Sequence, residues 1–197
     1  MENVLVVKTA LLGDIAEQNG LITGREGEVM DLLRTQSEFM PRPEAEQDPT
    51  HRQIIPYVAV VRGDEVFATT RLNKGGEARL HGMLSLGVGG HMNEIDREGD
   101  WLMHALRREV DEEIALDDFG PLTLRGIIND TTNEVGRVHL GVFFTLKTSG
   151  HAAVRETEKL EGGFIKLAAL SGLSDRMEGW SRIAARELER LWTAGTL

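Results

Sequence analysis

Apolar residues in this chain fall into short runs that glycine, proline and charged residues interrupt, and the spacing inside each run predicts its secondary structure. Residues 4–12 form the first run, which predicts a strand that ends before Gly13. Between residues 24 and 41 the apolar positions recur at near-helical spacing, with prolines at the end. This spacing predicts a helix.

Residues 41–50 are polar, acidic and proline-containing, a composition typical of a linker. We therefore expect an N-terminal strand–helix extension over residues 1–50 and a main domain over residues 51–197. The extension could cover a sheet edge, contribute to a homodimer or form a lid over a cleft, and the sequence does not choose among these roles.

The main domain mixes strands and helices. Two β-rich runs at residues 54–61 and 65–70 flank a tight Arg-Gly-Asp turn and predict a hairpin, and residues 84–92 predict a short strand that glycines interrupt. The other expected elements are strands over residues 122–130, 138–147 and 163–167, and an amphipathic helix over residues 177–192 with Trp180 and Trp192 in the core. This mixture predicts an α/β sandwich with a mixed sheet.

Composition narrows the functional classes. The chain of 197 residues is long enough for one substantial core. Its formal charge of −10 argues against binding nucleic acid or an anionic membrane surface, because both depend on cationic side chains. The absence of cysteine excludes disulfides, thiolate metal sites and thiol nucleophiles. No segment reads as a secretory signal or a membrane span, so we expect a cytoplasmic protein.

The most informative segment is the acidic run within residues 108–116. On a helix that begins near Asp100, Glu109, Glu112 and Glu113 share one side, where like charges repel and lower helix stability. A local rule broken in this way is typical of a functional site. Clustered carboxylate oxygens suit a hard divalent cation such as Mg²⁺, whereas the alternative is a solvated helix face that carries stray charges.

The segment around this run resembles the signature of the Nudix hydrolases. That pattern runs glycine, five residues, glutamate, seven residues, and then Arg-Glu-apolar-any-Glu-Glu-any-Gly-apolar. Gly90, Asp100 and residues 108–116 match it, with three departures: nine residues separate Gly90 from Asp100, aspartate replaces the first glutamate, and Ala115 replaces the glycine. We expect the helix to run on slightly past Ala115, because no glycine ends it there.

Residues 51–57, 80–82 and 87–91 are also similar to a bacterial Nudix branch described as predicted phosphoesterases, so the resemblance covers about residues 50–170. The resemblance implies a Nudix-type α/β/α sandwich. It also implies hydrolysis of a diphosphate bond in a nucleoside diphosphate derivative or a related organic pyrophosphate.

The resemblance further implies roles for individual residues. Glu109, Glu112 and Glu113, with the backbone carbonyl of Gly89, would bind Mg²⁺, or alternatively Mn²⁺. Arg108 would hold one carboxylate in place. The general base stays open, because members of this family use either a signature glutamate or one from a distant loop; the loop candidates here are Glu134, Glu156 and Glu158.

Basic residues near the expected cleft could contact phosphate. The candidates are Arg71, Arg79 and His91, together with Lys74 and His81. His139 lies in an apolar strand and is expected to be structural.

Sequence features distinguish a hydrolase from other functions found on the same fold. A non-catalytic sensor would tend to lose the carboxylates, and a diphosphate isomerase would be expected to use a cysteine, which this chain lacks. RNA decapping is disfavoured by the negative charge. The sensor is the main alternative to a hydrolase.

Overall fold

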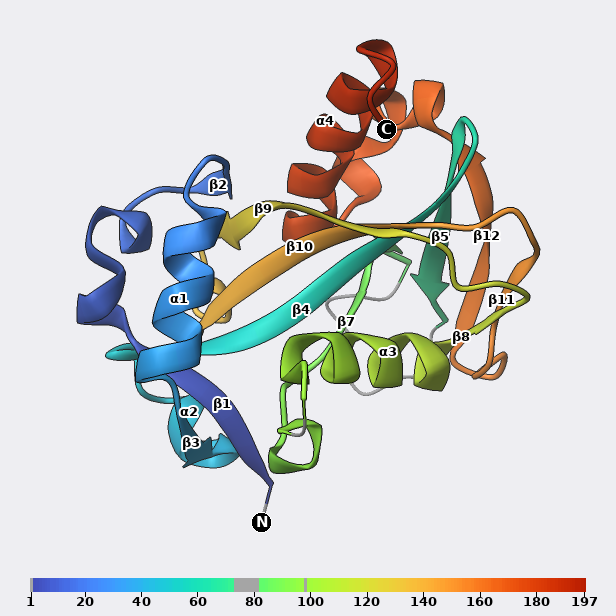
Figure 1. Ribbon diagram of the computed structural model, residues 1–197. Coiled ribbons are helices and arrows are strands. Elements are labelled where there is room, and N and C mark those ends of the chain that lie inside the picture. The colour runs from blue at the N-terminus through green and yellow to red at the C-terminus, as the bar shows by residue number, and fades with distance from the viewer. Residues whose placement is uncertain (1, 73–81, 98) are drawn as a thin grey trace. The chain divides into compact units, whose positions relative to one another are not determined.

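The computed structural model describes residues 2–72, 82–97 and 99–197 (Figure 1). The α-helices are α1 (Glu26–Gln36), α2 (Arg42–Ala45), α3 (Trp101–Glu113) and α4 (Gly179–Thr193). The strands are β1 (Asn3–Lys8), β2 (Gly20–Ile22), β3 (Glu38–Pro41), β4 (His51–Arg62), β5 (Glu65–Arg71), β6 (Leu84–Ser85), β7 (Val88–Gly89), β8 (Ile114–Leu116), β9 (Leu122–Asn129), β10 (His139–Lys147), β11 (Ala152–Val154) and β12 (Leu160–Lys166). Short 3-10 helices are η1 (Thr9–Ala16), η3 (Glu94–Asp96), η4 (Gly136–Val138), η5 (Leu167–Ala169) and η6 (Ser171–Arg176).

Within the described residues, ten of these strands belong to one sheet, and β8 and β11 form a second, two-stranded sheet. The main path runs β12-β5-β4-β10-β9-β2, while β1, β3, β6 and β7 pair off this path. The α/β class with a large mixed sheet is therefore confirmed. The expected strands over residues 122–130, 138–147 and 163–167 correspond to β9, β10 and β12.

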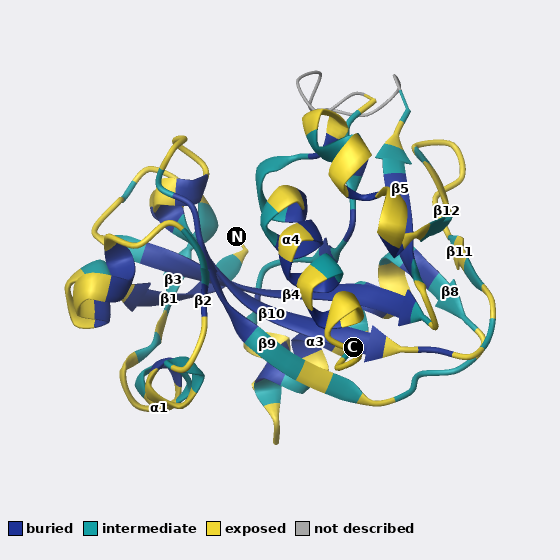
Figure 2. Cartoon of the chain, turned by 90° about the horizontal axis from the view of Figure 1, so that it is seen from above, coloured by how far each residue is buried: buried dark blue, intermediate teal, exposed yellow. Residues whose placement is uncertain are grey.

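The chain divides into two compact units, which are described separately. Unit 1 comprises Met1–Tyr57, Gly89–Arg108 and Leu124–Phe144, and unit 2 comprises Val58–Val88, Glu109–Thr123 and Thr145–Leu197. The elements α3, β4, β7, β9 and β10 contribute residues to both units. Strands β4 and β10 are buried along most of their length (Figure 2).

In unit 1, the N-terminal strand is part of the main sheet. Strand β1 pairs antiparallel with both β3 and β4, with Val6 opposite Gln53 of β4. Val4, Val6 and Ala45 form a fully buried cluster against which Met40 packs. Residues 41–50 are therefore not an open linker, because α2 within them contributes Ala45 to this cluster. The division into an extension over residues 1–50 and a domain over residues 51–197 stays a prediction.

The first apolar run is shorter as a strand than its sequence suggests. Strand β1 ends at Lys8, and the rest of the run continues into η1, which bends at Gly13 with a φ of 55°. Leu12 and Ile15, which belong to η1, are buried. Burial of a short apolar run is compatible with either state, so periodicity alone could not place the boundary.

In unit 2, the predicted hairpin forms between β4 and β5, with Arg62 opposite Glu65 and Gly63 at a φ of 58° in the turn. Strand β12 pairs antiparallel along β5. Helix α4 buries its predicted apolar stripe through Leu188 and Leu191, but Trp192 is 39% exposed, so its expected place in the core is wrong.

Three of the basic residues named above lie outside the described residues: Lys74, Arg79 and His81. Among the described residues, no helix is both long enough and apolar enough to cross a membrane.

Candidate active site

Helix α3 turns an apolar stripe toward the interior and carries acidic side chains at its C-terminal end. Leu102, Leu106 and Val110 are buried, as their i, i+4 and i+8 spacing requires for one face of a helix. Glu112 is exposed, whereas the last residue of the helix, Glu113, is partly buried. The surface of this helix therefore changes from apolar to acidic toward its C-terminal end.

Helix α3 begins next to Asp100, as the sequence predicts, and Asp100 caps it. The Asp100 carboxylate Oδ1 accepts a hydrogen bond from the backbone N–H of Met103 at 3.4 Å, and its carbonyl accepts one from His104 at 2.9 Å. This use of the Asp100 side chain satisfies a free helical N–H group and places negative charge at the positive end of the helix.

The C-terminus of α3 differs from the expectation. The helix ends at Glu113 and does not run past Ala115, which instead lies in β8 opposite Ala153 of β11. No non-glycine residue in the described ranges has a positive φ. Strand pairing takes up the backbone groups that a continued helix would have used, so the missing glycine imposes no left-handed strain on Ala115.

Arg108 forms a bidentate ion pair with Asp96, a residue of η3 that the sequence reasoning did not identify. The guanidinium Nε and Nη2 donate to the two Asp96 carboxylate oxygens at 3.1 and 2.9 Å, and Nη2 also donates to the His91 carbonyl at 3.0 Å. Asp96 is only 4% exposed, and it accepts a further hydrogen bond from the Asn93 backbone N–H at 2.8 Å. The C-terminal half of α3 and η3 are thereby tied to each other through fixed charges.

This pair corrects the alignment of the signature. Asp96 follows Gly90 after five residues, which is the family's spacing, whereas Asp100 follows it after nine. The four additional residues therefore lie between the acid and Arg108, where eleven residues replace seven. The five-residue spacing from Gly90 was the signal that could have identified Asp96, and the ion pair shows that this acid faces the arginine.

Several charged groups of unit 2 surround the Glu113 carboxyl. Its burial is the largest cause that raises its pKa, to about 7, and repulsion from Glu109, Glu156 and Glu178 adds to this rise, while Arg71 opposes it. Glu109 and Glu113 are thus close enough to repel each other, as their i, i+4 spacing predicts. The three glutamates of α3, Glu109, Glu112 and Glu113, are called the α3 carboxylate cluster below.

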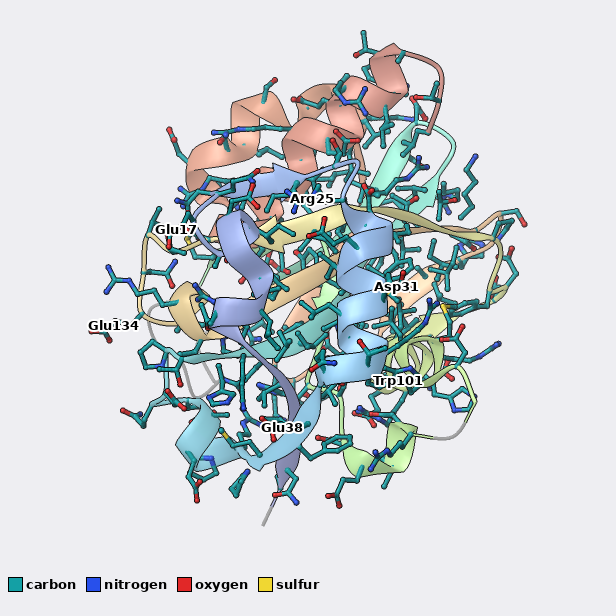
Figure 3. All side chains as sticks on the ribbon, turned by 60° about the vertical axis from the view of Figure 1, so that its left-hand side comes forward. Glu17, Arg25, Asp31, Glu38, Trp101 and Glu134 are labelled. Carbon is teal, nitrogen blue, oxygen red and sulfur yellow. The ribbon has the colours of Figure 1, made fainter. Side chains whose placement is uncertain are left out.

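The three loop candidates for a general base occupy different places. The backbone N–H of Arg155 donates to the Glu113 carbonyl at 2.9 Å, which fixes the segment containing Glu156 at the end of α3. The exposed Glu158 follows in the same segment. Glu134 is exposed in a loop of unit 1 and points away from the ribbon near it (Figure 3). Of these three glutamates, Glu156 is the one whose charge contributes to the raised pKa of Glu113.

Glu178 is a second residue that the sequence reasoning missed. It immediately precedes α4, and its Oε1 accepts hydrogen bonds from the hydroxyls of Ser85 at 2.6 Å and Ser181 at 3.3 Å. Ser181 in turn accepts the Leu86 backbone N–H at 2.9 Å. These contacts join segments more than 90 residues apart in sequence, so no local pattern could have predicted that Glu178 approaches Glu113.

Gly89 has a packing reason to be glycine. A Cβ atom there would lie 2.6 Å from the Pro56 carbonyl oxygen and 3.1 Å from the Tyr57 ring, because β7 approaches β4 closely. Gly89 and the glutamates of α3 belong to different units. The proposed use of its carbonyl as a metal ligand therefore stays a prediction.

The three basic residues proposed to contact phosphate, Arg71, Arg79 and His91, lie in different parts of the chain. Arg71 is exposed at the end of β5 and acts on the Glu113 carboxyl. His91 lies in unit 1 with its Nε2 3.3 Å from Nε2 of His139, and burial lowers the pKa of His91 to about 4. At pH 7 its imidazole is neutral, so it adds no positive charge for a phosphate. Arg79 lies outside the described residues.

The donor set at the end of α3 suits a hard divalent cation. Among the residues that the structure describes, no three histidine or carboxylate side chains already stand in a metal-ligating arrangement. The partly buried Glu113 next to Glu109 nevertheless provides oxygen donors whose mutual repulsion a bound cation would relieve. A cavity of about 10 Å³ in unit 2, lined by residues that include Thr69, Gly87 and Ile114, has room for about one water molecule and none for a nucleotide.

The relatives of the chain identify its family. No protein-family model matches the sequence. The chain is 38% identical to Protein YmaB of Bacillus subtilis over 174 residues. This alignment covers 84% of each of the two chains. It is 37% identical to Tm1382, a proposed Nudix hydrolase whose crystal structure superposes with a TM-score of 0.84 over 96% of this chain and 100% of that chain.

A more distant solved structure shares the fold alone. It is a bifunctional NMN adenylyltransferase/ADP ribose pyrophosphatase from Francisella tularensis, in complex with AMP and a manganese ion. The two chains are 13% identical and superpose with a TM-score of 0.53 over 73% of this chain and 42% of that one. Identity above one third with Tm1382, over nearly the whole chain and with the same fold, shows that this chain belongs to the Nudix hydrolase superfamily.

Proposed function

We propose that the chain is a Mg²⁺-dependent hydrolase that cleaves a diphosphate bond in a nucleoside diphosphate derivative or a related organic pyrophosphate. The observation that carries the proposal is the crowding of carboxylates at the end of α3, where the Glu113 pKa is raised to about 7. Membership of the Nudix hydrolases supports hydrolase chemistry in general. Mn²⁺ is the alternative ion, as the manganese in the Francisella tularensis complex suggests.

In this proposal, Glu109, Glu112 and Glu113 hold the cation together with the Gly89 carbonyl. When bound, the ion neutralises charge on the diphosphate and lowers the pKa of a coordinated water. Arg108 forms an ion pair with Asp96, and this pair holds the C-terminal half of α3 against η3, so that the helix presents its carboxylates in a constant orientation.

The remaining roles follow from position. Arg71, next to Glu113, is the proposed phosphate contact, while Arg79 and His91 stay lesser candidates. Glu156 is the preferred general base, because its segment is fixed to the end of α3, with Glu134 and Glu158 as alternatives. The partner is a small-molecule diphosphate and not nucleic acid or a membrane. Cytoplasmic residence and a homodimer complete the proposal.

The test is a panel of nucleoside diphosphate derivatives and other organic pyrophosphates, each incubated with purified protein and Mg²⁺ or Mn²⁺. Phosphate released after coupling to a phosphatase reports cleavage. We expect turnover of at least one compound, and loss of that turnover when EDTA removes the ion. A flat panel from folded protein would contradict the proposal and favour a ligand sensor, which direct binding of the same compounds would then detect.

The raised pKa of Glu113 predicts a pH-dependent stability. In the unfolded chain this carboxyl titrates near 4.5, so its contribution is fully present below that pH and is lost as pH rises through about 7, where the buried group must ionise. Without divalent cation, Glu113→Gln should therefore exceed the wild type in free energy of unfolding by about 2 kcal/mol at pH 8.5, and by much less at pH 5. The estimate is discounted for the partial exposure of Glu113.

Urea unfolding in EDTA at the two pH values measures this difference. Glu158→Gln, at an exposed glutamate of the same unit, is the matched control and should show no such gain. An advantage of Glu113→Gln that is equal at pH 5 and pH 8.5 would show that ionisation of Glu113 is not its cause.

A further inference from the structure

Two histidines of unit 1, His91 and His139, approach each other through their Nε2 atoms. His91 follows β7 and His139 begins β10, and their Nε2 atoms are 3.3 Å apart. The ring centroids are 5.5 Å apart and the ring planes are inclined by 54°, so the rings do not stack. The edges that carry Nε2 are therefore turned toward each other.

Hydrogen bonding defines which nitrogen of His139 is available. Its Nδ1 lies 2.7 Å from the Val135 carbonyl oxygen, which can only accept a hydrogen bond, so Nδ1 carries the proton and Nε2 carries a lone pair. A backbone carbonyl that accepts the second N–H of an imidazole is the usual outer partner of a metal-ligating histidine, because it fixes the tautomer and the ring orientation.

The separation of the two nitrogens fits a tetrahedral metal ion. Nitrogens that each lie about 2.0–2.1 Å from zinc in tetrahedral geometry are about 3.3–3.4 Å apart, in agreement with the 3.3 Å seen here. Binding requires each imidazole of His91 and His139 to tilt until both lone pairs meet at one point, and His91 to carry its proton on Nδ1. Imidazole nitrogen selects Zn²⁺, Co²⁺ or Ni²⁺ over Mg²⁺.

Charged groups of unit 1 act on this pair. Arg42 lowers the pKa of both imidazoles, while Glu46 raises both and Glu2 raises that of His91. Both carboxylates now bind Arg42, Glu46 at 2.8 Å and Glu2 at 3.0 Å. The Glu46 side chain is 44% exposed, so it is free to exchange this surface ion pair for a metal ligand at little cost.

We propose that His91 and His139 form a binding site for a borderline transition-metal ion such as Zn²⁺, separate from the Mg²⁺ site of the α3 carboxylate cluster. Glu46 is the proposed third ligand after it leaves Arg42, since the three described side chains do not form a ligating group as they stand, and water completes the coordination. The site lies wholly within unit 1 and uses nitrogen donors, whereas the carboxylate cluster lies in unit 2 and uses oxygen donors alone. The two sites therefore differ in the ions they select.

Titration with Co²⁺ tests the proposal, because tetrahedral Co²⁺ with nitrogen ligands gives a distinct visible absorption. The titration is run on the full chain in excess Mg²⁺, which occupies the oxygen site, and Zn²⁺ is then added as a competitor. We expect one Co²⁺ per chain and displacement by Zn²⁺. His91→Gln and His139→Gln should each weaken binding by at least about tenfold, since loss of an outer-shell partner alone already costs that much.

Two variants serve as controls. His151→Gln removes an exposed histidine of unit 2 and should leave Co²⁺ binding unchanged, as should Glu112→Gln, which removes a proposed Mg²⁺ ligand. Circular dichroism shows whether each variant folds, and Glu46→Gln gives a test at an exposed position should a histidine variant misfold. Equal Co²⁺ binding by wild type and folded His139→Gln, or loss of binding in Glu112→Gln, would overturn the proposal.

Discussion

Replacing Glu112 by glutamine should lower Mg²⁺-dependent turnover by about two to three orders of magnitude, the size of effect seen when one electrostatic stabiliser is removed from an active site. The substitution keeps the shape of the side chain and removes one of the three charges proposed to hold the cation. Glu112 is exposed at the end of α3, so the fold should remain intact. Loss of one like charge should even stabilise the helix slightly.

Asp111→Asn is the matched control for this experiment. Asp111 is the neighbouring exposed acid on the same helix, and its substitution makes the same change in net charge. Initial rates are measured on whichever compound the panel identifies, with circular dichroism to verify folding. Full activity of Glu112→Gln, or an equal loss in Asp111→Asn, would remove Glu112 from the proposed metal site.

Breaking the ion pair between Asp96 and Arg108 should cost about 3 kcal/mol of unfolding free energy, because either single substitution removes a bidentate, oppositely charged group from a largely buried charge. Asp96 is 4% exposed and Arg108 is 21% exposed, so neither charge is well hydrated once the other is gone. Asp96→Ala and Arg108→Met should each be strongly destabilising. The double variant should recover much of the loss, because it removes both charges together.

A double-mutant cycle by urea denaturation measures this coupling. The exposed pair of Asp64 and Lys166, at 2.9 Å, is the control: Asp64→Ala should leave the free energy of unfolding nearly unchanged. Additive effects of Asp96→Ala and Arg108→Met would show that the two side chains are not coupled. Loss of Mg²⁺-dependent turnover in variants that remain folded would show that this pair also positions α3 for catalysis.

The helices and strands that depend on local residue spacing could be predicted from the sequence. The hairpin around Gly63, the buried stripe of α3 and the apolar face of α4 all follow from spacing within a few residues, since a regular element repeats its geometry at a fixed period. The acidic end of α3 was evident for the same reason. Both β8 and β11 were missed, because each has only three residues and is held mainly by pairing with the other.

Residues brought together by the fold were harder to predict. Asp96 was passed over in favour of Asp100, because Asp96 keeps the family spacing from Gly90 while Asp100 keeps the spacing to Arg108, and the contact with Arg108 decides between them. Glu178 accepts a hydrogen bond from Ser85, which lies 93 residues away in the chain, and it acts on the Glu113 carboxyl at the end of α3. No periodicity encodes such a contact, because it depends on how separate elements pack.

The order of residues in the chain was therefore enough to establish the mixed α/β class, the acidic helix and the resemblance to Nudix hydrolases, because these rest on short-range spacing and on a contiguous motif. Tertiary structure decided which carboxylate pairs with Arg108, which acids raise the pKa of Glu113 and why Gly89 tolerates no side chain. It also brought the Nε2 atoms of His91 and His139, which are 48 residues apart in the chain, to within 3.3 Å of each other. Burial and Coulomb interactions act over a few ångströms in space, and only the folded chain determines which groups lie within that distance.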